Sequence, residues 1–211
     1  MNVTIEGLAG PLEGLLDEPE AGAGQPLRAA VVFAHPHSQH GGTMHTKAVY
    51  QGAKGLARIG CAVLRFNFRG VGLSAGEFDQ GRGETQDYLA ALDFVERQYP
   101  GSPIWAAGFS FGSWIALETG ARDARVSALI AVAPPVARAG YSFPNTLQSE
   151  KPKFLIQGDL DELCPLPELW AFYAKLREPK ELVVIDGASH LFEGKTAEVG
   201  EALADLLGDF E

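Results

Sequence analysis

The feature of this sequence that most constrains its fold is the alternation of short, wholly apolar runs with segments of helical periodicity. The apolar runs are rich in β-branched residues and span 29–34, 61–68, 104–109, 126–133, 154–157 and 182–185. A strand that is apolar at every position is buried on both faces, which is typical of a parallel sheet covered by helices. The pattern predicts an α/β fold: one doubly wound domain over residues 1–211, with a mostly parallel sheet and helices on both faces.

The segments between the apolar runs have the spacing of amphipathic helices. One helical face is predicted from the apolar positions Tyr88, Leu92, Val95 and Tyr99, and the same spacing recurs at Val199, Leu203, Leu206 and Phe210. Further helices are expected over 49–57, 114–119 and 167–176. Residues 3–16, interrupted by glycine and proline, predict a strand pair at a sheet edge, and 137–152 is the longest irregular connection.

Composition limits the classes of partner and compartment. The 211 residues include 17 Lys and Arg against 27 Asp and Glu, a net charge of −10, so nucleic acid and membrane surfaces are not expected partners. No apolar run reaches the roughly 18 residues of a membrane helix, and the first residues do not read as a signal peptide. Cys61 and Cys164 have no disulfide or zinc spacing. We therefore expect a cytoplasmic protein with free, buried thiols.

The strongest motif is Gly108-Phe-Ser-Phe-Gly112, which joins a predicted strand to a predicted helix. This is the G-x-S-x-G pattern in the strand–turn–helix context that it requires. Glycine is expected on both sides because a Cβ there would collide with neighbouring backbone. The turn should expose Ser110 Oγ at the carboxyl edge of the sheet and place the Phe111 amide at a helix N-terminus, facing a developing oxyanion. The alternative interpretation is a glycine-flanked serine that only caps a helix.

A serine nucleophile needs a base and an acid. The only histidine after Ser110 is His190, just past the last predicted strand, and Asp159 and Asp161 follow the preceding strand. His190 would accept the serine proton, and the carboxylate would hold the imidazole and stabilise its cation, so activity should rise as His190 loses its proton. Asp186, on the loop of His190, is a weaker candidate for the acid.

These motifs resemble the α/β-hydrolase superfamily, in its small lidless branch near the dienelactone-hydrolase-like proteins, over residues 29–210. In that family the acid strand ends in G-x-x-D with a proline a few residues on, which Gly158, Asp161 and Pro165 match. The resemblance therefore implies Ser110, Asp161 and His190 as the catalytic residues. Residues 134–153, where relatives insert a cap, suffice for a loop and one turn of helix but are too few for a cap domain.

Four of the five histidines lie close together, at His35, His37, His40 and His45. The resemblance places an oxyanion loop here, with His35-Pro36-His37 in the position of His-Gly-x. Pro36 has no N–H, so we expect the backbone N–H groups of His37 and Phe111 to form the oxyanion hole. His40 and His45 are expected to be solvated or to cap a helix.

The same histidines allow a metal-dependent alternative. His35, His37 and His40 have the H-x-H-x-x-H spacing of metallo-β-lactamase-type hydrolases, but Gln39 stands where that family has Asp. We therefore expect no metal and no other cofactor.

Three other polar residues near these motifs are expected to be structural. Arg69 should brace the glycine-rich loop after the fourth strand, Glu84 should favour a helix start, and Cys164 should be unreactive.

Together these observations predict a serine hydrolase that cleaves small carboxylic esters through an acyl-enzyme on Ser110. Thioesters and lactones are alternative substrates for the same three residues. A metal-dependent hydrolase and a non-catalytic binding protein of the same fold are the alternatives from other classes. A site without a cap favours short acyl chains.

Overall fold

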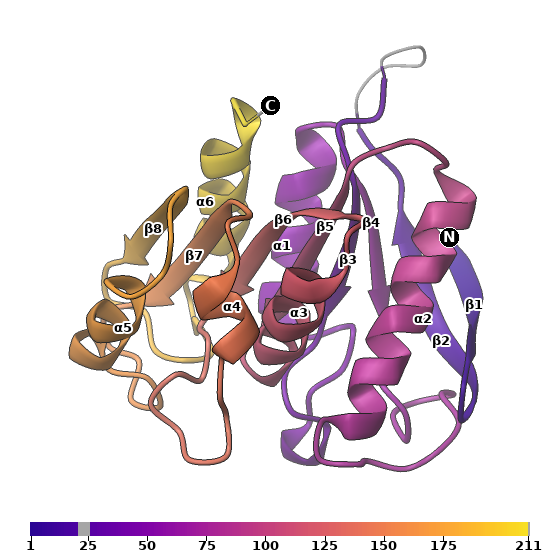
Figure 1. Ribbon diagram of the computed structural model, residues 1–211, viewed down its shortest axis with the longest axis horizontal. Helices are drawn as coiled ribbons and strands as arrows, with labels where there is room; N and C mark the ends of the chain where they lie inside the picture. Colours follow the sequence, from indigo (N-terminus) through magenta and orange to yellow (C-terminus); the bar gives the residue numbers. More distant parts are fainter. Residues whose placement is uncertain (21–25, 211) are drawn as a thin grey trace.

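The computed structural model describes residues 1–20 and 26–210, which form an eight-stranded sheet flanked by helices (Figure 1). The strands are β1 (Asn2–Gly7), β2 (Gly10–Asp17), β3 (Ala30–Ala34), β4 (Ala62–Phe66), β5 (Ile104–Phe109), β6 (Val126–Val132), β7 (Lys153–Gly158) and β8 (Lys180–Ile185). The α-helices are α1 (Lys47–Arg58), α2 (Arg82–Gln98), α3 (Phe111–Arg122), α4 (Pro144–Gln148), α5 (Leu166–Tyr173) and α6 (Thr196–Gly208), and Ser38–His40 form a 3₁₀ turn.

The sheet is parallel except at one edge. Its strand order is β1-β2-β4-β3-β5-β6-β7-β8, and only the β1–β2 and β2–β4 pairings are antiparallel. The prediction of a mostly parallel sheet with an N-terminal strand pair at its edge is confirmed. The strand order reverses around β3 and β5, so the loops that follow these neighbouring strands diverge and leave a crevice at the carboxyl edge of the sheet.

Helices cover both faces of the sheet, as predicted. Helices α2 to α5 lie on one face, while α1 and α6 pack together on the other (Figure 1). Each face has its own apolar core, and strands β3, β4 and β5 are buried along their entire length because their side chains contribute to both cores. No helix within the described residues combines the length and apolar character needed to cross a bilayer.

One sequence expectation about the elements is wrong, and another is made more specific by the structure. The run at 182–185 was expected to be buried on both faces, but β8 is an edge strand of which only Ile185 is buried. The connection 137–152, expected to be irregular with room for one turn of helix, contains the five-residue helix α4, whose start is held by the Glu118 carboxylate through the amides of Asn145 and Thr146. Five residues are too few to produce a helical periodicity in a sequence.

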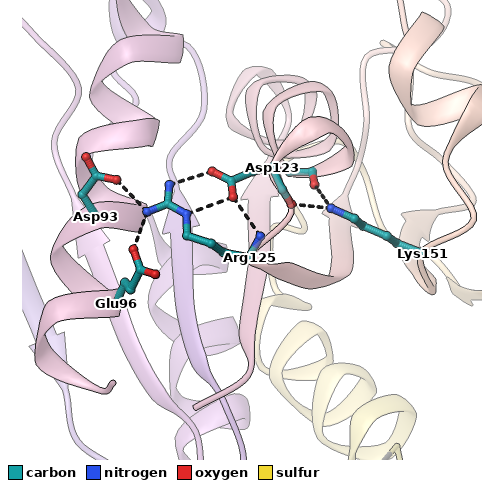
Figure 2. Close-up of polar contacts among 6 residues, drawn as sticks. Asp93, Glu96, Asp123, Arg125 and Lys151 are labelled. Atoms are coloured by element: carbon teal, nitrogen blue, oxygen red, sulfur yellow. Dashed lines mark hydrogen bonds and ion pairs between the residues drawn. The ribbon is translucent and has the colours of Figure 1, made fainter. Parts of the chain in front are cut away.

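Charged residues join the elements at the amino edge of the sheet (Figure 2). Arg125, just before β6, bonds Asp93 and Glu96 on α2 and Asp123 at the end of α3, with N–O distances of 2.6–2.7 Å. Lys151 Nζ donates to the carbonyls of Gly120 and Asp123, so it caps the C-terminus of α3. This network lies at the opposite edge of the sheet from the crevice.

Candidate active site

Ser110 lies in a sharp turn between β5 and α3. Its φ of 51° and ψ of −118° are strained for a residue with a side chain. A Cβ on Gly108 would overlap the carbonyl of Gly112, and a Cβ on Gly112 would overlap the carbonyl of His35. Both glycines are therefore required for the close approach of β5, α3 and the loop after β3, as the motif predicts.

The structure brings Ser110, His190 and Asp161 into one hydrogen-bonded chain. Ser110 Oγ lies 2.9 Å from His190 Nε2, and His190 Nδ1 lies 2.8 Å from Asp161 Oδ2. The Asp161 and His190 side chains are almost fully buried. Because the Asp161 carboxylate can only accept a hydrogen bond, His190 Nδ1 carries the proton. His190 Nε2 is therefore free to accept the serine proton.

Four donors surround the Asp161 carboxylate. Oδ1 accepts from the amides of Leu163 and Cys164 at 2.8 and 2.9 Å, while Oδ2 accepts from His190 and from Gln157 Nε2, the latter at 2.7 Å. The carboxylate is therefore oriented by the turn that follows it as well as by side chains. Gln157 was not identified from the sequence, although it is the one polar residue inside the apolar run Phe154–Gln157.

The two other candidate acids are not at the histidine. Asp159 Oδ1 accepts from the Ala188 amide at 3.2 Å, so it holds the loop that carries His190. Asp186 is exposed. A Cβ on Gly158 would overlap the Ala188 carbonyl, so the ends of β7 and of the His190 loop are in direct contact.

His35 braces the loop after β3. Its ring is fully buried, Nε2 accepts from the Phe68 amide at 3.0 Å, and Nδ1 donates to the Pro36 carbonyl at 2.6 Å. Burial lowers the pKa of His35 to about 4, so the imidazole is neutral at physiological pH. The side chain ties the end of β3 to the end of β4.

Of the two residues predicted to form the oxyanion hole, Phe111 directly follows Ser110 in the chain, and His37 lines the same cavity as Ser110. Neither the His37 nor the Phe111 amide donates a hydrogen bond to any other described residue. The two rings are 5.1 Å apart, and Gly42 lets the loop return because a Cβ there would overlap the Pro36 carbonyl. Both amides are thus available to a ligand oxygen.

The clustered histidines do not form a shared ligand set. The Phe68 amide occupies His35 Nε2, while the rings of His37 and His40 lie 4.8 Å apart. Across residues 1–20 and 26–210, no group of three or more His, Cys, Asp or Glu side chains is arranged to hold a metal ion. Burial, and then the charges of His40 and Arg138, lower the pKa of His37.

A cavity of about 450 Å³ opens onto Ser110 and His190. Its walls are largely apolar, and its charged or polar lining residues follow the ends of five strands, β3, β5, β6, β7 and β8. The lining residues that the sequence did not identify are Pro135, Arg138, Ala139, Tyr141, Glu162, Leu163 and Leu191. These residues follow β6, β7 and β8, so only the folded sheet edge brings them together.

Three residues near the site have the structural roles expected of them. Arg69 forms a two-pronged ion pair with the buried carboxylate of Asp87, and Glu84 accepts from the amides of Gly81 and Asp79 at the start of α2. Burial raises the pKa of the Cys164 thiol to about 11, which disfavours a reactive thiolate.

Comparisons with known proteins identify the family and the fold of this chain. The family model described as serine aminopeptidase, S33, matches residues 25–150. A solved α/β serine hydrolase homologue from Coxiella burnetii is 41% identical, with a TM-score of 0.89 over 98% of this chain and 97% of that one. An α/β serine hydrolase without a lid from Xanthomonas campestris is 35% identical, with a TM-score of 0.88 over 98% and 93%. An uncharacterized protein of Rickettsia prowazekii (strain Madrid E) is 36% identical over 92% of this chain and 85% of its own length.

Proposed function

This chain belongs to the α/β-hydrolase superfamily, in the family described as serine aminopeptidase S33, and from that premise we propose that it hydrolyses small carboxylic esters through an acyl-enzyme on Ser110. The observation that carries the proposal is the chain of two hydrogen bonds from Ser110 Oγ through His190 to Asp161, beside an open cavity. This order of groups activates a serine hydroxyl without any cofactor.

The first half of the reaction acylates the serine. His190 Nε2 takes the hydroxyl proton as Ser110 Oγ attacks the ester carbonyl, and the amides of His37 and Phe111 donate to the resulting oxyanion. One such donor contributes about 3 kcal/mol of transition-state stabilisation in comparable sites. The tetrahedral intermediate collapses when the imidazolium of His190 returns its proton to the leaving alkoxide, which releases the alcohol.

The second half removes the acyl group. A water molecule gives its proton to His190 Nε2 and attacks the acyl carbonyl, and the same two amides receive the oxyanion. The proton then returns to Ser110 Oγ as the carboxylic acid leaves. Asp161 keeps the imidazole oriented in both halves and does not itself take up a proton.

The cavity supports a small substrate. Its volume of about 450 Å³ and its walls of proline, alanine and leucine suit a short acyl or aryl group. Esters are favoured because an alkoxide leaves with less acid assistance than an amine does. Thioesters and lactones need the same nucleophile, base and oxyanion donors, so they are alternative substrates of the same site.

Labelling with a fluorophosphonate probe tests the proposal. We expect wild-type protein to be labelled at Ser110, Ser110→Ala to lose both label and esterase activity, and His190→Ala to be labelled at least a thousandfold more slowly (about 10³ or more). Peptide mass spectrometry locates the adduct. Ser127→Ala is the matched control, because Ser127 lies on β6 away from the cavity and should label normally. Label on a residue other than Ser110, or full activity in Ser110→Ala, would contradict the proposal.

A further inference from the structure

Gln157 is a buried polar side chain next to the proposed catalytic acid. It lies near the carboxyl end of β7, and its side chain is fully buried. Nε2 donates to Asp161 Oδ2 at 2.7 Å and to the Cys164 carbonyl at 2.9 Å. Gln157 does not line the cavity, so it contacts Asp161 from behind the site.

The orientation of the Gln157 amide is determined by its neighbours. Rotating the amide by half a turn would point Oε1 at the Asp161 carboxylate and at the Cys164 carbonyl, both of which are acceptors. In the orientation present, Oε1 is buried and has no hydrogen-bond partner among the described residues. A buried, unpaired carbonyl oxygen is unfavourable. Gln157 keeps this orientation because only its NH₂ group can donate the two hydrogen bonds to Asp161 and Cys164.

The bond from Gln157 acts on the oxygen that His190 uses. Asp161 Oδ2 accepts from both Gln157 Nε2 and His190 Nδ1, at 2.7 and 2.8 Å. A second donor on one carboxylate oxygen withdraws electron density from it and restricts rotation of the carboxylate. Both effects influence how strongly Asp161 stabilises the imidazolium of His190 that forms during each acyl transfer.

We propose that Gln157 is a positioning residue of the hydrolase, which fixes the Asp161 carboxylate and limits the basicity of Oδ2, so that His190 releases its proton readily to the leaving group. The inference rests on the proposed function of Ser110. The other titratable or charged groups around the pair are Glu162, Asp159, Cys164, His37, His40 and Arg138. Gln157 is the only side chain besides His190, among the described residues, that hydrogen-bonds Asp161.

Two substitutions separate the donor from the shape of the side chain. Gln157→Met keeps the volume and removes the donor, so Asp161 Oδ2 becomes more basic and favours the protonated form of His190. Gln157→Glu keeps the shape, and because a buried carboxyl beside the Asp161 carboxylate stays protonated, its O–H donates to Oδ2 in place of the amide. Thr119→Val is the matched control, because Thr119 Oγ1 is the other buried polar atom without a partner in the described chain and lies on α3.

The first readout is the pH dependence of p-nitrophenyl acetate hydrolysis. In Gln157→Met we expect the acid-limb midpoint of kcat/KM to rise by about half a pH unit or more, and kcat to fall about tenfold with KM nearly unchanged. In Gln157→Glu, which retains a donor to Oδ2, the midpoint should stay near the wild-type value. Thr119→Val should match the wild type in both respects.

The second readout does not depend on catalysis. The Cε1–H proton of His190, assigned by comparison with His190→Ala, is titrated by NMR in the wild type and in each variant. A midpoint for Gln157→Met within 0.2 pH units of the wild type (about the resolution of such a titration) would overturn the proposal, as would an equal shift in Thr119→Val. If Gln157→Met does not fold, Gln157→Leu, which also removes the donor, takes its place. If Ser110 proves unreactive, the proposed function fails, while the titration still measures the effect of Gln157 on His190.

Discussion

Burial determines the protonation state of His35, a residue near the site. Its ring is enclosed between the ends of β3 and β4, with one nitrogen accepting from the Phe68 amide and the other donating to the Pro36 carbonyl. Only the neutral imidazole has one donor and one acceptor, so protonation would break the bond to Phe68. The shape of the loop that presents the His37 amide therefore depends on an uncharged His35.

This dependence predicts a loss of stability at acid pH. The pKa of His35 is about 4 in the folded protein and 6.5 in an unfolded chain, so between these values the unfolded state binds a proton that the folded state does not. The contribution of neutral His35 to the free energy of unfolding is complete above pH 6.5 and is lost as the pH falls towards 4. We expect it to lower the free energy of unfolding by about 2 kcal/mol at pH 5.

Urea unfolding at pH 7 and pH 5 measures this effect. His35→Gln is the informative variant, because its Oε1 accepts from the Phe68 amide and does not titrate. The variant should lose less stability than the wild type between the two pH values. Equal losses in the two proteins would show that His35 is not the responsible group.

At the scale of elements, the Arg125 network joins three parts of the fold that are separate in sequence. Arg125 pairs with α2 through Asp93 and Glu96 and with the end of α3 through Asp123 (Figure 2). The hydrogen bond from Arg125 holds the pKa of Asp123 below its usual range, so that pairing persists at neutral pH and weakens only in acid. Asp123 is mostly buried, whereas Asp93 and Glu96 are half exposed and contribute less.

Removing the charge of Arg125 should destabilise the fold without affecting the active site. We expect Arg125→Met to lower the free energy of unfolding by about 1 kcal/mol in low salt. The loss should be smaller in 1 M NaCl, where the Debye length is about 3 Å and the ion pairs are screened. Esterase activity should be unchanged, because the network lies at the amino edge of the sheet. Arg82→Met, which breaks the exposed Arg82–Asp79 pair, should have almost no effect in either salt concentration. A similar loss in both variants would argue against a special role for the network.

At the scale of the whole molecule, the size of the site follows from what the chain places between β6 and β7. In the described structure this segment is a loop with the five-residue helix α4, and its residues Pro135, Arg138 and Tyr141 form one wall of the cavity. The opposite walls come from the loops after β3, β7 and β8. The resulting cavity of about 450 Å³ is open at the surface, which supports our proposal that the substrates carry small acyl groups.

The acyl-chain profile tests this limit. We expect p-nitrophenyl acetate and butyrate to be hydrolysed at least about tenfold faster, in kcat/KM, than the palmitate ester, because a long chain finds little apolar surface to cover it. Rates measured below the critical micelle concentration keep the substrates comparable. Faster turnover of the palmitate than of the short esters would contradict the assigned size of the site.

Most of the fold could be predicted from the sequence because its signals are local. Burial on both faces of a strand requires apolar residues at each position, so the runs at β3, β5 and β6 are visible without any tertiary information. The edge strand β8 and the short helix α4 could not be predicted in the same way. The position of a strand in the sheet is not encoded in its own residues, and one turn of helix leaves no periodic pattern.

The sequence by itself determined the α/β sheet, the strained turn at Ser110 and the order of serine, carboxylate and histidine along the chain. These features depend on periodicity and on steric conflicts between near neighbours, as at Gly108 and Gly112. The family resemblance favoured Asp161 over Asp159, but only the tertiary structure decided the hydrogen bond between Asp161 and His190, the position of Gln157 behind it, and which side chains enclose the cavity. These contacts depend on how loops from five strand ends converge at one edge of the sheet, which no single stretch of sequence specifies.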